Sequence, residues 1–190
     1  GTTTVEATSG GVTGTASVSV TQAVASVTVT PTQHTFTSVG ETKAFSAQAF
    51  DANGNLIAGA TFSWASGDRR TATVDGFGTA TAVGNGTTTF EATSGGVTGA
   101  ASVTVAQAVA TVTVTPDPHT FTSVGETQAF TAQAFDANGN LIPSATFTWA
   151  SGNTGIISVN ATGIATAEAN GRTTVEATSG GVTGTASVTV

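Results

Sequence analysis

The sequence contains no cysteine, no methionine and no tyrosine, and charged residues make up only 8% of its 190 positions. Without cysteine the chain has no disulfide to compensate for a small core, so packing alone must hold each domain together. The net charge is −7 and only four residues are basic. This argues against a nucleic-acid partner, because phosphate binding needs clustered lysine and arginine. No run approaches the roughly 18 apolar residues that a membrane span needs, so we expect no span.

The sequence repeats itself at a fixed step of 85 residues. For example, Trp64–Gly67 returns as Trp149–Gly152, and the two whole copies agree at 61 of 85 positions. The expected units are residues 1–20, which match only the last two strands of a repeat, and the whole repeats 21–105 and 106–190. A step this long indicates whole domains in a row instead of small solenoid units.

Each repeat alternates apolar and polar residues with period two, which is the pattern of β-strands. Glycine and Asn-Gly turns recur at intervals of roughly 8 to 12 residues, and no stretch has helical spacing. The expected fold class is therefore all-β, an antiparallel sandwich of two sheets with about seven or eight strands per repeat. The large side chains expected in the core are Phe45, Phe62, Trp64, Phe90, Phe130, Phe147 and Trp149, with Trp64 on a central strand.

Short segments spread over the first repeat carry a family pattern: Val27–Pro31, Val39–Thr42, Asp51–Asn55, Ser63–Ser66, Ala72–Asp75, Gly86–Thr88, Ala92–Val97 and Ala101–Val105. They resemble the bacterial immunoglobulin-like domain of group 2, and the resemblance covers each whole repeat. It implies tandem immunoglobulin-like sandwiches without catalytic residues. It also implies extracellular arrays of the kind found in bacterial surface adhesins, secreted enzymes and phage structural proteins.

A search for catalytic groups finds none. His34 and His119 occupy one position in the two repeats, beside threonine, glutamine and proline. A catalytic histidine needs an orienting carboxylate and a nucleophile within reach, and neither stands next to them. We interpret both histidines as surface residues of an edge strand, and we expect no enzyme activity in this chain.

Oxygen-bearing side chains alternate in the loops Asp51–Asn55 and Asp136–Asn140, as they do in calcium loops. The twelfth-position glutamate of such a loop is missing, because residue 62 is phenylalanine, and the main alternative is a tight Asn-Gly turn. A calcium site shared between domains through Asp117 or Glu91 stays open, and no other cofactor is expected. The weak calcium candidates are Asp51, Asn53, Asn55, Asp136, Asn138 and Asn140.

Three aromatic residues are candidates for a contact surface. By alternation, Phe50 and Phe135 point away from the core, and Phe77 lies in a turn flanked by glycines. The alternative is that a bend turns Phe50 inward beside the Asn-Gly turn. The two repeats differ most densely over residues 68–77 and 153–162, which predicts a varied surface on a constant scaffold.

The linkers Val20–Val24 and Val105–Val109 leave almost no slack, which predicts a semi-rigid rod. The first functional hypothesis is a structural, non-catalytic stalk, adhesin shaft or extracellular filament subunit, secreted or on a bacterial cell surface. Its partners would be neighbouring copies of the same repeat or chain, up to a homopolymer. The alternative is a module that binds a glycan or host protein through 68–77 and 153–162. Residues 1–20 end an upstream domain or are donated to a neighbour.

Overall fold

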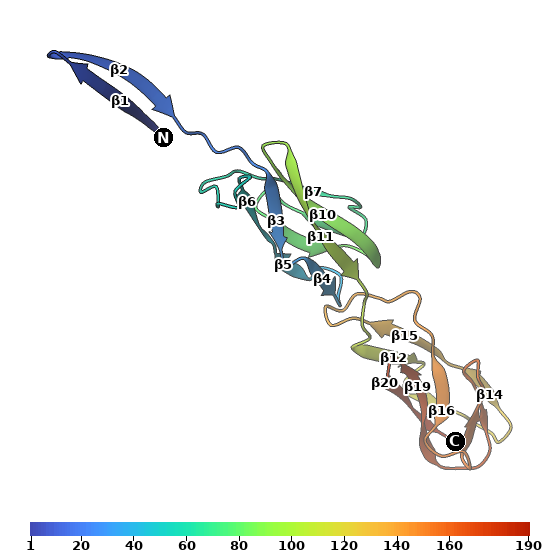
Figure 1. Ribbon diagram of the computed structural model, residues 1–190. Coiled ribbons are helices and arrows are strands. Elements are labelled where there is room, and N and C mark those ends of the chain that lie inside the picture. The colour runs from blue at the N-terminus through green and yellow to red at the C-terminus, as the bar shows by residue number, and fades with distance from the viewer.

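A computed structural model describes all 190 residues (Figure 1). The hairpin at the N-terminus consists of β1 (Thr2–Ser9) and β2 (Val12–Ser19). The first repeat contains β3 (Ser26–Thr30), β4 (Gln33–Phe36), β5 (Thr42–Ala44), β6 (Ser46–Phe50), β7 (Ser63–Ser66), β8 (Ala72–Val74), β9 (Thr79–Ala82), β10 (Gly86–Ser94) and β11 (Val97–Val105). The second contains β12 (Thr111–Thr115), β13 (His119–Thr120), β14 (Thr127–Ala129), β15 (Thr131–Phe135), β16 (Thr148–Ser151), β17 (Ile157–Val159), β18 (Ile164–Ala167), β19 (Arg172–Ser179) and β20 (Val182–Thr189).

Each repeat is a two-layer sandwich, so the predicted all-β fold class is confirmed. One layer of the first repeat has the strand order β4-β11-β10-β7, and the other consists of β3-β6 and β5-β9-β8. The second repeat follows the same order, with β13-β20-β19-β16 in one layer and β12-β15 and β14-β18-β17 in the other. No helix is present that has the length and apolarity to cross a membrane.

Two details differ from the expected seven or eight antiparallel strands. Pro31 has no N–H for a ladder, and it separates β3 from β4. After this break the chain changes layers, and β4 pairs parallel to β11. A second break falls at Phe45, whose N–H donates to the carbonyl of Gly78 at 2.8 Å. One expected strand is therefore divided into β5 and β6, which pair with β9 and β3 respectively.

The core lies between the two layers and is rich in edge-to-face aromatic contacts. In the first repeat Phe36, Phe45 and Phe90 are buried. The ring centroids of Phe45 and Phe90 are 5.2 Å apart at 90°, an arrangement that the ring quadrupoles favour. In the second repeat Phe121 and Phe130 are buried in the same way.

Trp64 does not lie on a central strand, because β7 is the edge of its sheet. Its ring is half-buried against the core and lies over Gly78, where an added Cβ would come 3.0 Å from Cζ2. Phe62 is also half-buried, and Trp149 and Phe147 occupy the matching places in the second repeat. The tryptophan therefore closes one side of the sandwich instead of bridging its centre.

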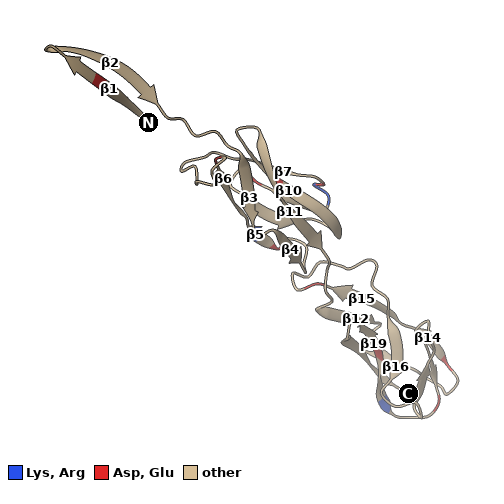
Figure 2. Ribbon diagram, in the orientation of Figure 1, with Lys and Arg blue, Asp and Glu red and all other residues tan.

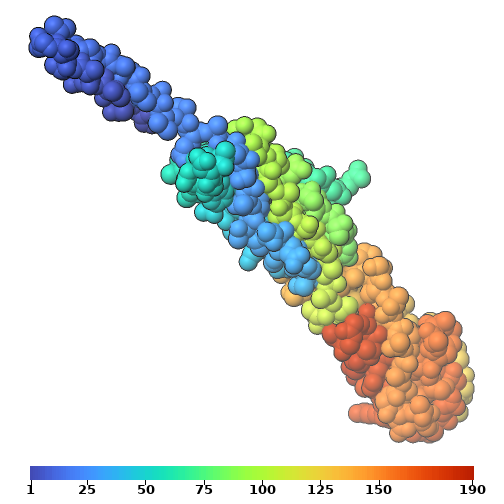
Figure 3. All heavy atoms as spheres, in the orientation of Figure 1, coloured from blue at the N-terminus to red at the C-terminus, as the bar shows by residue number.

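Residues 1–20 form a hairpin whose strands pair only with each other. The hairpin differs from residues 171–190 at only two of 20 positions, yet its apolar face is uncovered. Val5 is 56% exposed, whereas its counterpart Val175 is fully buried against the second repeat. Figure 3 shows the hairpin and the two repeats arranged in line along an elongated molecule.

Candidate functional site: the joint between the repeats

The linker between the repeats is held by backbone hydrogen bonds at both of its ends. The N–H of Ala106 donates to the carbonyl of Phe36 in the first repeat at 2.9 Å. The N–H of Ala110 donates to the carbonyl of Phe135 in the second repeat at 2.8 Å. The linker thus continues the pairing of both domains, and no free segment separates them.

The loop that follows β15 is organised around the carboxylate of Asp136. Its Oδ1 accepts hydrogen bonds from the backbone N–H groups of Asn138 at 3.0 Å and Asn140 at 2.9 Å. Gly139 takes a φ of 79°, a left-handed conformation that glycine adopts without steric cost. The sequence Asp-Ala-Asn-Gly-Asn therefore folds into a tight turn capped by the Asp136 side chain. This is the Asn-Gly turn that the sequence offered as the alternative to a calcium loop.

This loop binds the backbone of a turn in the first repeat. The N–H of Val39 donates to Oδ2 of Asp136 at 2.9 Å. The carbonyl of Val39 accepts from the side-chain Nδ2 atoms of Asn138 and Asn140, each at 2.9 Å. Both polar backbone groups of one residue are thus satisfied by the neighbouring domain, which fixes the distance and the orientation between the two turns.

Gln107, in the linker, joins the same network. Its Nε2 donates to Oδ2 of Asp136 at 2.9 Å and to the carbonyl of Leu141 at 3.4 Å. On the other side, its Oε1 accepts from Nδ2 of Asn85 at 3.1 Å, and its N–H donates to Oδ1 of Asn85 at 2.8 Å. One glutamine therefore connects a loop of the first repeat to the Asp136 loop of the second.

Asp136 is 2% exposed, although it carries a charge at neutral pH. Burial raises its pKa, but hydrogen bonds donated by Gln107, Asn140 and Val39 outweigh that effect and lower the pKa from 3.8 to about 2. Both carboxylate oxygens are taken by N–H donors. A calcium ion at Asp136 would have to displace these donors, so the geometry favours an interdomain contact at this loop.

The other calcium candidates lie in the equivalent loop of the first repeat. Oδ1 of Asp51 accepts from the N–H groups of Asn53 at 3.0 Å and Asn55 at 2.9 Å. No group of three or more His, Asp or Glu side chains is close enough to hold a metal ion. Asp117, considered for a shared site, accepts a hydrogen bond from the N–H of Ser187 at 2.8 Å.

The aromatic candidates for a contact surface fall into two groups. Phe77 is 93% exposed at a turn of the first repeat. Phe50 and Phe135 are half-buried, and each forms an isolated antiparallel bridge across its Asn-Gly loop, to Leu56 and Leu141. They therefore help to close the loops that carry Asp51 and Asp136.

His34 and His119 lie on β4 and β13, which are edge strands as expected, but their rings turn inward. The His34 ring centroid lies 4.6 Å from that of Phe36, and the His119 centroid 4.7 Å from that of Phe121. The Nε2 atom of each ring is buried without a hydrogen-bond partner. The missed signal is the spacing: each histidine stands two residues before a buried phenylalanine, so alternation along the strand places both rings on the inner face.

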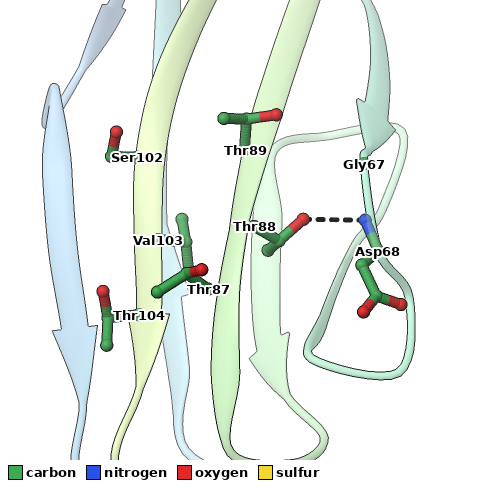
Figure 4. Close-up of a pocket in the computed structure, with 8 residues that line it drawn as sticks. All are labelled: Gly67, Asp68, Thr87, Thr88, Thr89, Ser102, Val103 and Thr104. Carbon is green, nitrogen blue, oxygen red and sulfur yellow. Dashed lines mark hydrogen bonds between the residues drawn. The ribbon is translucent and has the colours of Figure 1, made fainter.

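A shallow recess lies beside the varied segment of the first repeat. In Figure 4, the hydroxyl of Thr88 points toward the backbone of Asp68, and Oγ1 of Thr88 accepts from the N–H of Asp68 at 2.7 Å. The second repeat has no matching recess. Figure 2 shows charges scattered sparsely over the molecule, with a basic segment between β7 and β8. The lining residues of the recess are Gly67, Asp68, Thr87, Thr88, Thr89, Ser102, Val103 and Thr104.

Known proteins resemble this chain over most of its length. Ice-binding protein 1 of Shewanella frigidimarina is 28% identical over 167 residues, which are 87% of this chain and 19% of that protein. The chain therefore spans about a fifth of the length of this relative.

Solved structures that resemble this chain include surface-layer protein SbsC, domains 4–9, at 24% identity and a TM-score of 0.42. That match covers 100% of this chain and 35% of the other. The Escherichia coli adhesin FdeC matches at 21% identity and a TM-score of 0.45, over 94% of this chain and 69% of the other.

The family described as bacterial Ig-like domain (group 2) matches residues 23–105 and again residues 108–190. The two matches meet at the linker, so the joint described above lies between two domains of one kind. The chain belongs to the group 2 bacterial Ig-like domain family and carries two tandem copies of its domain.

Proposed function

We propose that this chain is a structural, non-catalytic segment of a secreted or surface-anchored bacterial protein. Its domains form a semi-rigid array that serves as a stalk, an adhesin shaft or a subunit of an extracellular filament. The observation that carries the proposal is the joint, in which Asp136 and two asparagines hold both backbone groups of Val39. Such a joint fixes the orientation of each domain relative to the next, which is what a spacer requires.

The composition supports the same proposal. With 8% charged residues and no cysteine, the surface offers threonine, serine and glycine in place of ionic partners or redox chemistry. The family match and the ice-binding relative support a location outside the cell. Antibody labelling of unpermeabilised cells tests the location, and labelling only after permeabilisation would contradict it.

Small-angle scattering of the full chain tests the semi-rigid array. The parent should scatter as the extended body of Figure 3, with one narrow set of interdomain distances. The control is a variant with a flexible Gly-Ser-Gly-Ser insertion after Ala106, which breaks the linker pairing. A parent curve that matches the insertion variant would contradict the proposal.

A second candidate function is ligand binding at the varied segment of the first repeat. Arg69 and Arg70 are exposed beside the hydroxyl-lined recess, and Phe77 protrudes into solvent. The second repeat has Thr154, Gly155 and Thr162 at these positions. Protruding cationic and aromatic groups on one copy only are typical of a recognition surface and give nothing to the sandwich.

The second repeat supplies the matched variant for testing this candidate. The triple substitution Arg69→Thr, Arg70→Gly and Phe77→Thr converts the surface of the first repeat to that of the second. Binding on a glycan array that the parent shows and the triple variant loses would support the recognition function. Equal binding by both proteins, or none by either, would count against it.

A further inference from the structure

The first repeat carries the same docking loop as the second, but no partner fills it. Asp51 Oδ2 accepts from Nε2 of Gln22 at 3.1 Å, as Asp136 accepts from Gln107, and Asn55 caps the loop as Asn140 does. The backbone N–H that Val39 supplies to Asp136 has no counterpart at Asp51.

A recess lies where that counterpart would sit. It borders the Asp51 loop and is lined by Asn53 and Asn55, the counterparts of Asn138 and Asn140, whose amides bind Val39 at the other joint. The main lining residues are Val20, Thr21, Gln22, Asp51, Asn53 and Asn55.

The opposite end of the molecule carries the complementary half. The turn of the second repeat that matches the Val39 turn is preformed, because Oε2 of Glu126 accepts from the N–H of Thr122 at 2.7 Å. Gly125 takes a φ of 86°, close to the 80° of Gly40 in the occupied turn. Val124 is 59% exposed at its tip, and its N–H and carbonyl have no partner in the chain.

We infer that the Asp51 loop is a docking surface for the Ser-Val-Gly turn of a further repeat of this kind. The inference rests on the proposed semi-rigid array. The valine N–H of that repeat donates to Oδ2 of Asp51, and its carbonyl accepts from the amides of Asn53 and Asn55. The Val124 turn is likewise the surface for another Asp-Ala-Asn-Gly-Asn loop. Each repeat thus has a valine turn at one end and an Asp-Ala-Asn-Gly-Asn loop at the other, and the contact propagates in a single direction.

Two features favour a tethered repeat over a free second copy as the occupant. A short linker places the turn beside the loop at a high effective concentration, so a small set of hydrogen bonds suffices. In addition, residues 1–20 share 17 of 20 positions with residues 86–105 and, like them, stand directly before a short linker to a whole repeat. A separate copy that docked in this register would meet that hairpin, whereas a tethered repeat uses it as its own last two strands.

The direct test extends the full chain. A copy of residues 21–85 is placed before Gly1, so that residues 1–20 complete an added repeat whose own copy of the Val39 turn lies next to Asp51. Spin labels on Thr28 and on its added copy report the new joint, and labels on Thr28 and Thr113 report the existing one. The chain has no cysteine, so each label goes only where a cysteine is introduced.

The expected result is a narrow distance distribution at both joints. Asp51→Ala should broaden only the new distribution, and Asp136→Ala only the existing one, so each variant is the other's control. The inference is overturned if the distance distribution at the new joint is broad while that at the existing joint is narrow. It is also overturned if Asp51→Ala leaves the distribution at the new joint unchanged. A broad existing joint would instead overturn the proposed function.

A second extension keeps the inference testable if the first does not fold. A whole copy of residues 106–190 is added after Val190, which brings an Asp-Ala-Asn-Gly-Asn loop to the Val124 turn. The amide hydrogen of Val124 should then exchange with solvent at least tenfold more slowly than in the 190-residue chain, because it gains a carboxylate acceptor. Unchanged exchange in a folded protein would overturn the inference.

Discussion

Gly78 shows how one residue of the turn after β8 determines the packing of the edge tryptophan. The turn is capped by Asp75, whose Oδ1 accepts from the N–H groups of Phe77 at 2.9 Å and Thr79 at 2.8 Å. Gly78 has a φ of 86°, and its α-carbon faces both the Phe45 carbonyl and the Trp64 ring. Any side chain here meets strain in the backbone and a clash in the core.

Gly78→Ala should therefore destabilise the first repeat by about 2 to 4 kcal/mol, through left-handed backbone strain and overpacking. Gly76→Ala is the control, because Gly76 has an ordinary φ, has nothing within 4 Å of its added Cβ and is alanine in the second repeat. Urea denaturation of both variants measures the difference. Equal midpoints for the two would show that the turn is not constrained in this way.

At the scale of elements, the large core side chain comes from a different strand in each of the two repeats. In the first repeat β10 contributes Phe90 and β8 contributes Ala72, whereas in the second the matching residues are Val175 and Ile157. All four side chains are fully buried. A large residue has moved from one strand to the other while the summed volume stays similar, and cores tolerate such exchanges.

A double-mutant cycle tests this exchange. Phe90→Val alone should destabilise the first repeat by about 2 kcal/mol, because it leaves a cavity between the layers. Adding Ala72→Ile should restore part of the loss, with a coupling of at least about 0.5 kcal/mol measured by denaturant unfolding. Additive effects of the two substitutions would mean that the strands are packed independently.

Acid should loosen the Asp136 loop from the Val39 turn. The pKa of Asp136 is lowered to about 2 from 3.8, so the stabilisation is complete above pH 3.8 and is lost as pH falls towards 2. Hydrogen exchange of the Val39 amide measures this, with the Val124 amide, which has no acceptor, as the control inside the same chain. The Val39 amide should lose its extra protection between these pH values. Protection that persists at pH 2, or that is lost near pH 5, would contradict the assignment.

The strands and turns could be predicted from the sequence because their signals are local. Period-two alternation and Asn-Gly turns required nothing beyond neighbouring residues. The parallel pairing of β4 and the edge position of Trp64 depend on which segments meet across the sandwich. The joint is harder still to predict from the sequence, because Val39 and Asp136 are 97 positions apart and the contact uses the backbone groups of Val39. One signal was present: the Asp51–Asn55 loop is unchanged in both repeats while 68–77 differs.

At the scale of the whole molecule, we propose that the joint makes two small domains act as one longer body. No salt bridge takes part, because the bonds run from amides to a carboxylate and to backbone carbonyls. The charged oxygens of Asp136 are buried within the contact. The arrangement should therefore depend little on ionic strength, since screening acts mainly on exposed charges.

Calcium should not be needed for this rigidity. The carboxylate of Asp136 is filled by N–H donors, so adding about 1 mM CaCl₂, which saturates weak extracellular calcium modules, should leave the melting temperature and the scattering curve unchanged. The control is the same titration with MgCl₂ after treatment with a chelator. A joint that stiffens only in calcium would return the six loop residues Asp51, Asn53, Asn55, Asp136, Asn138 and Asn140 to consideration as ligands.

Residual dipolar couplings from both repeats in one weakly aligned sample measure whether the joint holds the two domains in a fixed orientation. If the joint holds the domains as one body, a single alignment tensor fits the couplings of residues 23–105 and 108–190 in the orientation of Figure 1. Asp136→Ala should then split the fit into two tensors of different magnitude. Two different tensors in the parent protein would contradict the claim that the Asp136 loop fixes one repeat on the next.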